Sequence, residues 1–191
     1  MRLMTTQPTP DAQLIALVAQ GDKAAFSALV KRHLPRAYAI ARRTLNSDSE
    51  AEDAAQEAFS KIWVNARDYN PDKAAFTTWL HRIVVNASLD MARKKRPVSV
   101  EDEVLHSVAD TRDDAEQQLA GREQAEQVRA AIATLPPQQR AAITLCYTEE
   151  YSNAEAASIL GVHIKALEGL LVRARKSLRT KLSEKGARDA A

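Results

Sequence analysis

One row of side chains between Trp79 and Arg93 has the chemistry needed to hold an unpaired nucleic-acid strand. Its members recur every three or four residues, as on one side of a helix: Trp79, Arg82, Asn86, Asp90 and Arg93. An indole ring can stack on an exposed base, which contributes about 1–3 kcal/mol per base, and the cations can hold the backbone. Trp79 alone could equally pack at the edge of a domain, because amphipathic aromatic side chains are often half-buried. The complete row favours strand binding.

A second candidate surface for nucleic acid lies between Ser152 and Arg175. The stretch Ser152-Asn153-Ala154-Glu155 fits a capping box that starts a short helix, and Gly161 suits the turn to a second helix that begins at Val162 or His163. Helical spacing predicts a buried stripe of Ile164, Leu167, Leu171, Ala174, Leu178 and Leu182. The opposite face carries Lys165, Ala166, Gly169, Arg173 and Lys176.

The small residues at the start of this face would let the helix enter a major groove, and the cations further along would contact phosphates. The pattern predicts a helix-turn-helix. The alternative is an ordinary helical hairpin with a solvated face, and the capping box, the glycine and the basic continuation together disfavour it.

A third polar face lies on the helix expected between Ser47 and Ala66. It consists of Asp53, Gln56, Glu57 and Ser60. Acidic groups repel phosphate, so this surface suits a protein partner, although a merely solvated face is the usual explanation for one polar helix face.

The elements that must position these side chains are all predicted to be helices. The chain of 191 residues has only five glycines and few aromatic residues, which favours an all-α protein. Capping residues, with Asp11 for the first helix and Asp22 for the second, and breaking residues predict helices over about 11–20, 22–46, 47–66, 73–95, 122–135 and 137–148, before the two helices of the helix-turn-helix. Pro35 should kink or split the second of these. Helical spacing predicts two further buried stripes: Ala51, Ala55, Ala58 and Ile62 on the third helix, and Phe76, Leu80, Ile83, Ala87 and Met91 on the fourth.

Charge divides the chain into two basic parts and an acidic connector. The stretch from Glu101 to Glu126 contains nine acidic residues but only two arginines, whereas basic runs lie at 93–96 and 173–181. Two basic patches suggest two contacts with a polyanion. We therefore expect two small helical domains, residues 1–97 and 122–185, joined by a flexible acidic linker over 98–121.

Several classes of function are disfavoured by what the sequence contains. The four histidines, His33, His81, His106 and His163, have no metal-ligand spacing, no nucleophile has an evident base, and no glycine-rich loop could hold phosphate. We expect no enzyme activity, no metal and no cofactor. The single Cys146 excludes an internal disulfide, and a buried structural thiol is favoured over a redox sensor. No stretch has the length and apolarity of a signal peptide or membrane span, so we expect a cytoplasmic protein.

In two sets of sequence motifs the chain resembles the bacterial sigma factors of the extracytoplasmic-function type. The stretches AEDAAQEAF and FTTWLHRIVVNASLDMARKK resemble region 2 of that family. The stretches LPPQQRAAITLCYTEEYSNAEAASILGV and RARKSLR resemble its region 4. The resemblance runs from Asp11 to Leu182, apart from the linker, and the two motif sets occur in the family's order.

The resemblance implies roles and partners. It implies that Asp53, Gln56 and Glu57, with Ser60 beside them, dock on the clamp helices of the largest subunit of RNA polymerase, and that the second-largest subunit is a further partner. It also implies that the turn 67–73 and the following helix capture the non-template strand of the −10 element, with Asn70, Trp79, Arg82, Asn86, Asp90, Arg93 and Lys94. The helix-turn-helix would read the −35 element as duplex, with His163, Lys165, Ala166, Gly169, Arg173, Arg175 and Lys176. The linker would thread toward the polymerase active-site channel, and an anti-sigma factor would be the usual antagonist.

One departure from the family concerns the recognition helix. Many members carry a serine flanked by basic residues at its middle, where this chain has Leu167-Glu168-Gly169-Leu170. A carboxylate repels phosphate but can accept a hydrogen bond from cytosine. The identity of the residues that read the −35 bases is therefore left open, whereas Arg173 and Arg175 are assigned to phosphate contacts.

Two rival functions remain at this point. A dimeric helix-turn-helix regulator would bind a palindromic site without core polymerase, whereas the resemblance implies no obligate homo-oligomer. A sigma mimic that titrates an anti-sigma factor would be expected to lose Asn86, Arg93 and the basic tail, all of which are present.

Overall fold

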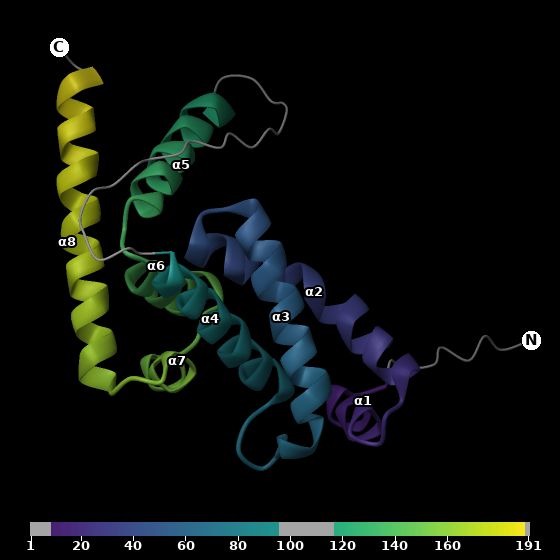
Figure 1. Ribbon diagram of the computed structural model, residues 1–191. Coiled ribbons are helices and arrows are strands. Elements are labelled where there is room, and N and C mark those ends of the chain that lie inside the picture. Colours follow the sequence, from purple (N-terminus) through teal and green to yellow (C-terminus); the bar gives the residue numbers. More distant parts are fainter. Residues whose placement is uncertain (1–8, 96–116, 190–191) are drawn as a thin grey trace, which may run out of the picture.

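The described part of the chain is helical, and short turns join the helices within each half (Figure 1). The structure is a computed structural model that describes residues 9–95 and 117–189, and no strand occurs within these ranges. The α-helices are α1 (Asp11–Val18), α2 (Lys23–Leu45), α3 (Asp48–Asn65), α4 (Phe76–Lys94), α5 (Gln117–Ala133), α6 (Pro137–Ile143), α7 (Asn153–Leu160) and α8 (Ile164–Asp189). A 3₁₀ turn, η1 (Ala66–Asp68), follows α3, and a π-helical turn, η2 (Thr144–Thr148), follows α6. The prediction of an all-α protein is confirmed.

The N-terminal half, α1 to α4, is a bundle in which α2, α3 and α4 pack against one another and α1 packs against α2. The side of α3 that faces the bundle consists mainly of alanines, with Ile62 and Phe59 near its C-terminal end. Small side chains let neighbouring backbones approach closely. The predicted buried stripe of α3, which is Ala51, Ala55, Ala58 and Ile62, is confirmed.

The start of the bundle differs from the expectation in one respect. Asp11 does not cap α1, because the helix already begins at Asp11 and Pro10 takes the N-cap position. The Asp11 carboxylate instead pairs with Arg32 and lies 2.9 Å from Nε2 of His33, so that it ties α1 to α2. Asp22 caps α2 as predicted, accepting hydrogen bonds from the backbone amides of residues 24 and 25 at 2.8 and 3.0 Å.

Pro35 does not split α2, which continues as one helix from Lys23 to Leu45. Proline cannot donate to the carbonyl of Lys31, one turn earlier. Both residues lie on the exposed side of the helix, where water can satisfy that carbonyl. The cost of a proline inside a helix is therefore reduced at this position.

The C-terminal half, α5 to α8, contains the predicted helix-turn-helix. The side chain of Ser152 accepts a hydrogen bond from the Glu155 amide, and the Glu155 carboxylate accepts one from the Ser152 amide, so the capping box is confirmed. Gly161 adopts the left-handed conformation at φ 66° and ends α7. These two features set the angle between α7 and α8.

Three expectations for this half are corrected by the structure. Helix α5 begins at Gln117, earlier than the predicted start near Arg122, so residues 117–121 of the predicted linker are helical; residues 98–116 lie outside the described ranges. The helix predicted through Thr148 changes to π geometry at Thr144. Ile164 was placed in the buried stripe of α8 but is 39% exposed, because it stands at the first turn of the helix. Leu178 and Leu182 of the stripe are only partly buried, and Leu170, which the stripe did not include, is buried.

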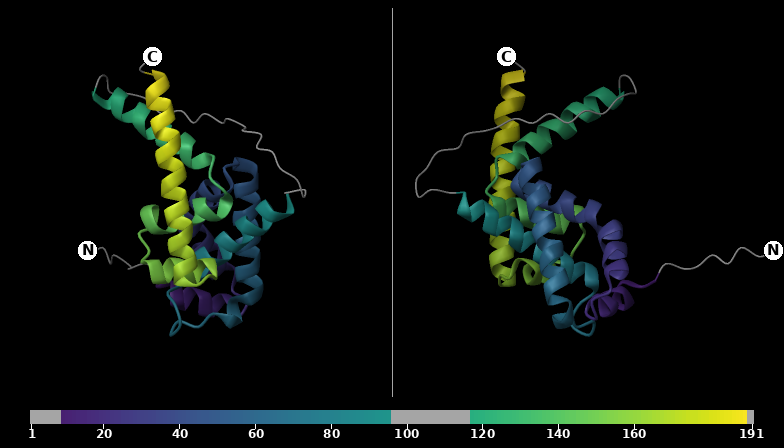
Figure 2. Two further views of the ribbon diagram at one scale, coloured as in Figure 1. Left: turned by 90° about the vertical axis from the view of Figure 1, so that its left-hand side faces the viewer. Right: turned by 45° about the vertical axis from the view of Figure 1, so that its right-hand side comes forward.

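The two halves pack against each other. Helix α6 contacts α2, and α7 contacts α4, whereas α8 runs along one side of the molecule beside α5 (Figures 1 and 2). Buried residues of both halves belong to one continuous hydrophobic cluster. Helix α4 is therefore buried on two sides. Phe76 and Leu80 face the bundle, while His81 contacts Tyr151 of the C-terminal half, and Ile83 and Met91 of the predicted stripe are only partly buried.

Candidate nucleic-acid and polymerase interfaces

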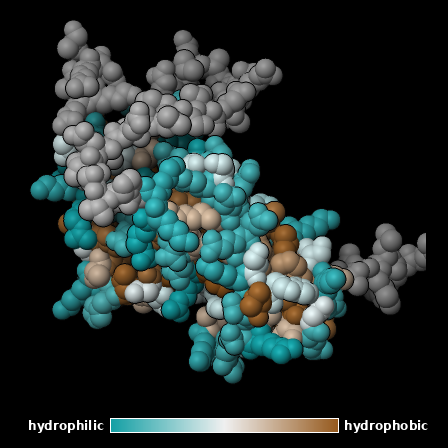
Figure 3. Space-filling model, viewed as in Figure 1, coloured by the Kyte–Doolittle hydropathy of each residue, from teal (hydrophilic) through white to brown (hydrophobic). Residues whose placement is uncertain are grey.

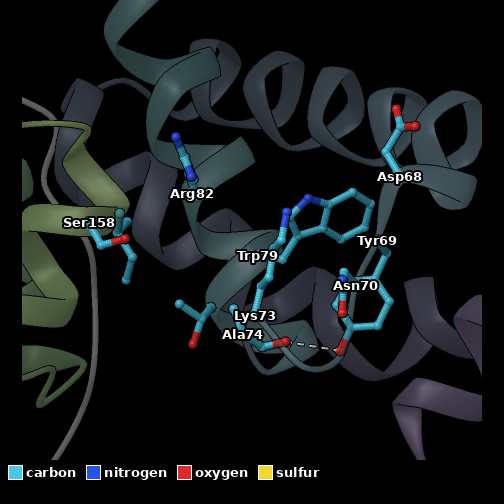
Figure 4. A pocket seen from close by; sticks show the side chains of 10 residues that line it. Asp68, Tyr69, Asn70, Lys73, Ala74, Trp79, Arg82 and Ser158 are labelled. Carbon is cyan, nitrogen blue, oxygen red and sulfur yellow. Dashed lines mark hydrogen bonds between the residues drawn. The ribbon is translucent and has the colours of Figure 1, made fainter.

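A pocket of about 370 Å³ lies beside the first turns of α4 (Figure 4). Its lining combines aromatic rings, an amide, two cations and two residues of α7: Asp68, Tyr69, Asn70, Lys73, Ala74, Thr78, Trp79, Arg82, Ser158 and Ile159. The loop between η1 and α4 forms one wall, and α4 forms another. The predicted residues Asn70, Trp79 and Arg82 are thus brought together.

Trp79 is held in place by other aromatic rings rather than standing free. Its ring centroid lies 5.3 Å from that of Tyr69 and 6.1 Å from that of Phe76. The Tyr69 hydroxyl donates a hydrogen bond to the carbonyl of Ala74 at 3.2 Å, which fixes the loop against α4. Trp79 therefore packs at the edge of the bundle and also lines the pocket. The two explanations offered for it are compatible.

The loop that carries Asn70 is stabilised by the asparagine itself. The Asn70 side-chain oxygen accepts a hydrogen bond from the Asp72 amide at 2.8 Å. Its backbone carbonyl accepts one from the Lys73 amide at 3.2 Å. This turn directs Lys73 into the pocket lining, opposite the position that Arg82 takes on α4. A pocket with a stacking ring and two cations suits an unstacked nucleotide with its phosphate.

The resemblance assigned the turn 67–73 as a whole to strand capture, but of its residues only Asn70 was named as a site residue. Tyr69 and Lys73 were not singled out as pocket residues, because the stretch Tyr69-Asn70-Pro71-Asp72 was read from its residues as a turn. The available signal was the spacing of Tyr69 ahead of Phe76 and Trp79, which is a cluster of three aromatic residues in a chain that has few.

The remaining members of the predicted row continue along α4 on its exposed side. Asn86 and Arg93 are exposed, and Asp90 is partly buried. The Asp90 carboxylate accepts a hydrogen bond from Arg93 at 2.8 Å, so this acid is neutralised within the row. Lys94 is exposed at the end of the helix. The row therefore leads from the pocket to a cationic helix end.

An apolar groove of about 650 Å³ lies between α2 and α3. It is lined by Phe26, Val30, Leu34, Pro35 and Tyr38 of α2 and by Glu52, Ala55, Gln56, Phe59 and Ser60 of α3. Two of the residues predicted to bind polymerase, Gln56 and Ser60, thus form part of its rim. Asp53 is exposed on the same helix, whereas the Glu57 carboxylate pairs with Lys61 at 2.7 Å. Figure 3 shows hydrophobic patches over the region of α1 and α2 and over that of α7, on a face that is hydrophilic over much of its remaining area.

The outward face of α8 combines cations with small and apolar residues. His163, Lys165, Ala166, Arg173, Arg175 and Lys176 are exposed. Gly169 is partly covered, because the guanidinium of Arg173 lies over it, 3.4 Å from where a Cβ atom would stand. Nδ1 of His163 accepts a hydrogen bond from the Lys165 amide at 3.3 Å, so this ring supports the start of α8.

Val172 was missed on this face. It is 57% exposed and lies in line with Lys165, Gly169 and Lys176 at spacings of three and four residues. The sequence signal was available, because an apolar residue at this position interrupts the otherwise polar side of the helix. An exposed valine on a recognition helix can contact a thymine methyl group.

The other titratable candidates are structural. Cys146 is half-buried, and burial raises the pKa of its thiol, which disfavours the reactive thiolate. Within residues 9–95 and 117–189 no three His, Cys, Asp or Glu side chains are grouped as a metal site would need. None of the helices described is long and apolar enough to cross a membrane.

Comparison with known proteins agrees with this geometry. Residues 29–98 match sigma-70 region 2, and residues 125–178 match sigma-70 region 4. The ECF RNA polymerase sigma factor SigM of Mycobacterium tuberculosis is 36% identical over 170 residues, which cover 88% of this chain and 82% of SigM. SigW of Bacillus subtilis is 32% identical over 182 residues, which cover 89% of this chain and 95% of SigW.

A solved structure of CnrH in complex with the cytosolic domain of CnrY is similar throughout its length. Its TM-score is 0.63 at 29% sequence identity, with 91% of this chain and 97% of CnrH covered. The chain belongs to the sigma-70 family, as an extracytoplasmic-function sigma factor. Such a protein binds core RNA polymerase and directs it to promoters, and the family consists of sigma factors rather than enzymes.

Proposed function

We propose that the two halves divide promoter recognition between them. The N-terminal half captures the non-template strand of the −10 element once the duplex opens, and the C-terminal half reads the −35 element as duplex. The pocket formed by Tyr69, Lys73, Trp79 and Arg82 carries this proposal, because a stacking ring beside two cations fits one extruded nucleotide. Asn70 lies at its mouth, and Asn86, Asp90, Arg93 and Lys94 continue the path along α4.

On the −35 side, we assign Arg173, Arg175 and Lys176 to phosphates and the start of α8 to the major groove. Ala166 and Gly169 allow close approach of the helix, and His163 and Lys165 stand at its N-terminal end, the part that commonly contacts base edges. Val172 adds an apolar contact that suits a thymine methyl group.

For polymerase binding, we assign the groove between α2 and α3. The groove is apolar, and its rim carries Gln56 and Ser60, with Asp53 and Glu57 nearby on α3. Such a surface fits a helix that presents an apolar stripe with basic flanks. We place the clamp helices of the largest subunit there, and expect the second-largest subunit to contact the C-terminal half.

An anti-sigma factor is the antagonist that we propose for this chain. The basis is the similarity to CnrH, whose structure was solved with the cytosolic domain of CnrY. We further propose that the protein acts in the cytoplasm, at the nucleoid, where promoter DNA lies.

The pocket assignment is tested by strand binding in the holoenzyme. The holoenzyme assembled with the Trp79→Leu chain should bind a single-stranded −10 oligonucleotide about 5- to 150-fold more weakly than the wild-type holoenzyme, which corresponds to the loss of one stacked base. Tyr147→Ala is the matched control, because it removes an aromatic ring that is 59% exposed and lies outside the pocket. If the Trp79→Leu holoenzyme bound the oligonucleotide as tightly as the wild-type holoenzyme, the pocket would not be the strand-binding site.

A further inference from the structure

One acidic side chain, Glu168, lies on the exposed side of α8 among cations and small or apolar residues. It is the only acid between Ile164 and Ser183, a stretch that contains six lysines and arginines. Glu168 is exposed, and it is spaced three residues from Lys165 and four from Val172, so the three lie along one side of the helix. Carboxylates and phosphates repel each other, so an acid at this position weakens DNA binding unless it contacts something other than phosphate.

The stability of the helix does not explain this acid. An acid stabilises a helix from its first turn, next to the positive end of the macrodipole. Helix α8 begins at Ile164, so Glu168 already lies in its second turn. A cation four residues away would also stabilise the helix, but the two positions at that spacing are occupied by Ile164 and Val172.

The Glu168 carboxylate also lacks a cationic partner in the protein. Two acids on α3 and α4 pair with cations one turn away, with nitrogen–oxygen distances of 2.7 and 2.8 Å. No salt bridge in the part of the chain that the structure describes includes Glu168. Arg173 places its guanidinium over Gly169, and Nε of Arg175 donates to the carbonyl of Leu171 at 3.3 Å. The oxygens of Glu168 are therefore available to a ligand.

The donors that an acid on this helix can meet are those of the major groove. Base edges present two kinds of donor there, N4 of cytosine and N6 of adenine. Adenine has the acceptor N7 beside N6, whereas the edge of cytosine presents a donor and no acceptor. A carboxylate can only accept hydrogen bonds, so it fits cytosine and is repelled by the acceptors of the other three bases.

Glu168 lies where a recognition helix contacts base edges. Residues in the N-terminal part of such a helix point into the major groove. Val172 follows four residues later, about 6 Å along the helix axis at about 1.5 Å per residue. Base pairs are spaced by about 3.4 Å, so the two side chains contact different base pairs that are no more than two steps apart.

We propose that Glu168 is a specificity-determining residue, whose carboxylate accepts a hydrogen bond from N4 of a cytosine in the −35 element. The inference rests on the proposed function, because it takes α8 as the helix that reads this element. The cytosine lies within two base pairs of the position that Val172 contacts. Glu168 contributes selectivity more than affinity, since any other base leaves the carboxylate without a donor in the groove.

Two substitutions of Glu168 distinguish base reading from a general effect of charge. The holoenzyme assembled with each full-length variant is bound to a promoter library randomised across the −35 element, and the bound DNA is sequenced. Glu168→Ala removes the acceptor and should lower the preference for cytosine at one position by about 5- to 150-fold, the usual effect of one mismatched base pair. Glu168→Gln should prefer adenine at the same position, because glutamine can bind N6 and N7 of adenine together.

Glu126→Gln is the control for the loss of one negative charge. Glu126 is an exposed acid of the same half, but it lies on α5, outside the helix-turn-helix. The Glu126→Gln holoenzyme should select the wild-type sequence at every position. Val172→Ala should lose selectivity at a different position from Glu168→Ala, within two base pairs of the cytosine.

The inference is overturned if the Glu168→Ala holoenzyme selects the same −35 sequences as wild type, or if its binding changes equally for all sequences. It is also overturned if the position that Glu168→Ala alters is one where wild type selects a base other than cytosine. If Arg173→Ala in addition left binding to every −35 sequence unchanged, the assignment of α8 to the −35 element would fail, and not the role of Glu168 alone.

Discussion

At the scale of single residues, the DNA-facing side chains of α8 differ in what they can read. Arg173 lies along the helix over Gly169 and carries its charge outward. An arginine that contacts phosphate contributes affinity for any sequence, whereas Val172 can contact only a base edge. The two neighbours should therefore respond differently to substitution.

Arg173→Ala should weaken −35 binding by the holoenzyme to a similar extent on all base sequences. The slope of log K against log salt should fall by about 1, because one phosphate contact is lost. Val172→Ala should leave the salt slope unchanged and relax selectivity at one base position. Fluorescence anisotropy over a set of single-base variants measures both. An effect of Arg173→Ala at a single position would mean that it reads a base.

His81 links stability to pH. Burial, with the charges of Arg36 and His33, lowers the pKa of His81 from 6.5 to about 4. The unfolded chain therefore takes up a proton between about pH 6.5 and 4 that the folded chain does not. The stability that His81 contributes through this lowered pKa is fully present above pH 6.5 and is lost as the pH falls toward 4. Its loss lowers the free energy of unfolding by roughly 3 kcal/mol.

Urea unfolding at pH 7 and pH 5 measures this dependence. In His81→Leu the free energy of unfolding should fall less between the two pH values than in wild type. His163→Gln, at an exposed histidine, should keep the wild-type difference. If the free energy of unfolding of His81→Leu fell as much between pH 7 and pH 5 as that of wild type, other groups would be responsible for the pH dependence.

At the scale of elements, the turn between α7 and α8 was predictable because its determinants are local. A capping box needs only four consecutive residues, and a left-handed helix end needs only a glycine. The surroundings of α4 were not predictable in the same way. His81 is buried by Tyr151, 70 residues further along the chain. The sequence did indicate that α4 has a wide apolar surface. Val84 and Val85 are neighbours in sequence, so one narrow stripe cannot include both, and both are buried.

The two glycines of the helix-turn-helix should respond oppositely to alanine. Gly161 has φ 66°, so Gly161→Ala should lower the free energy of unfolding by about 1–2 kcal/mol. Gly169 lies inside α8, and the only neighbour that a methyl group would meet is the flexible end of Arg173. Gly169→Ala should therefore raise the free energy of unfolding by about 1 kcal/mol through helix propensity. Chemical denaturation measures both, and destabilisation by Gly169→Ala would show that Arg173 cannot move aside.

At the scale of the whole molecule, helix content, the order of the two halves and the family could be predicted from the sequence. The packing of the halves could not. Arg140 is one of many arginines in the sequence, and nothing near it indicates that it completes a helix about 95 residues earlier in the chain. Tyr69 and Lys73 lie in the turn 67–73 that the resemblance assigned to strand capture, but their turn chemistry gave neither residue a role of its own. Long-range contacts of this kind depend on the fold rather than on local pattern.

Run-off transcription on a promoter library tests the account most directly. With core RNA polymerase, the chain should direct initiation from one defined start, and activity should be lost when either the −10 or the −35 element is replaced. Neither component alone should initiate there. If the chain instead bound a symmetric operator as a tight dimer and gave no initiation with core polymerase, the division of promoter recognition between its two halves would be contradicted.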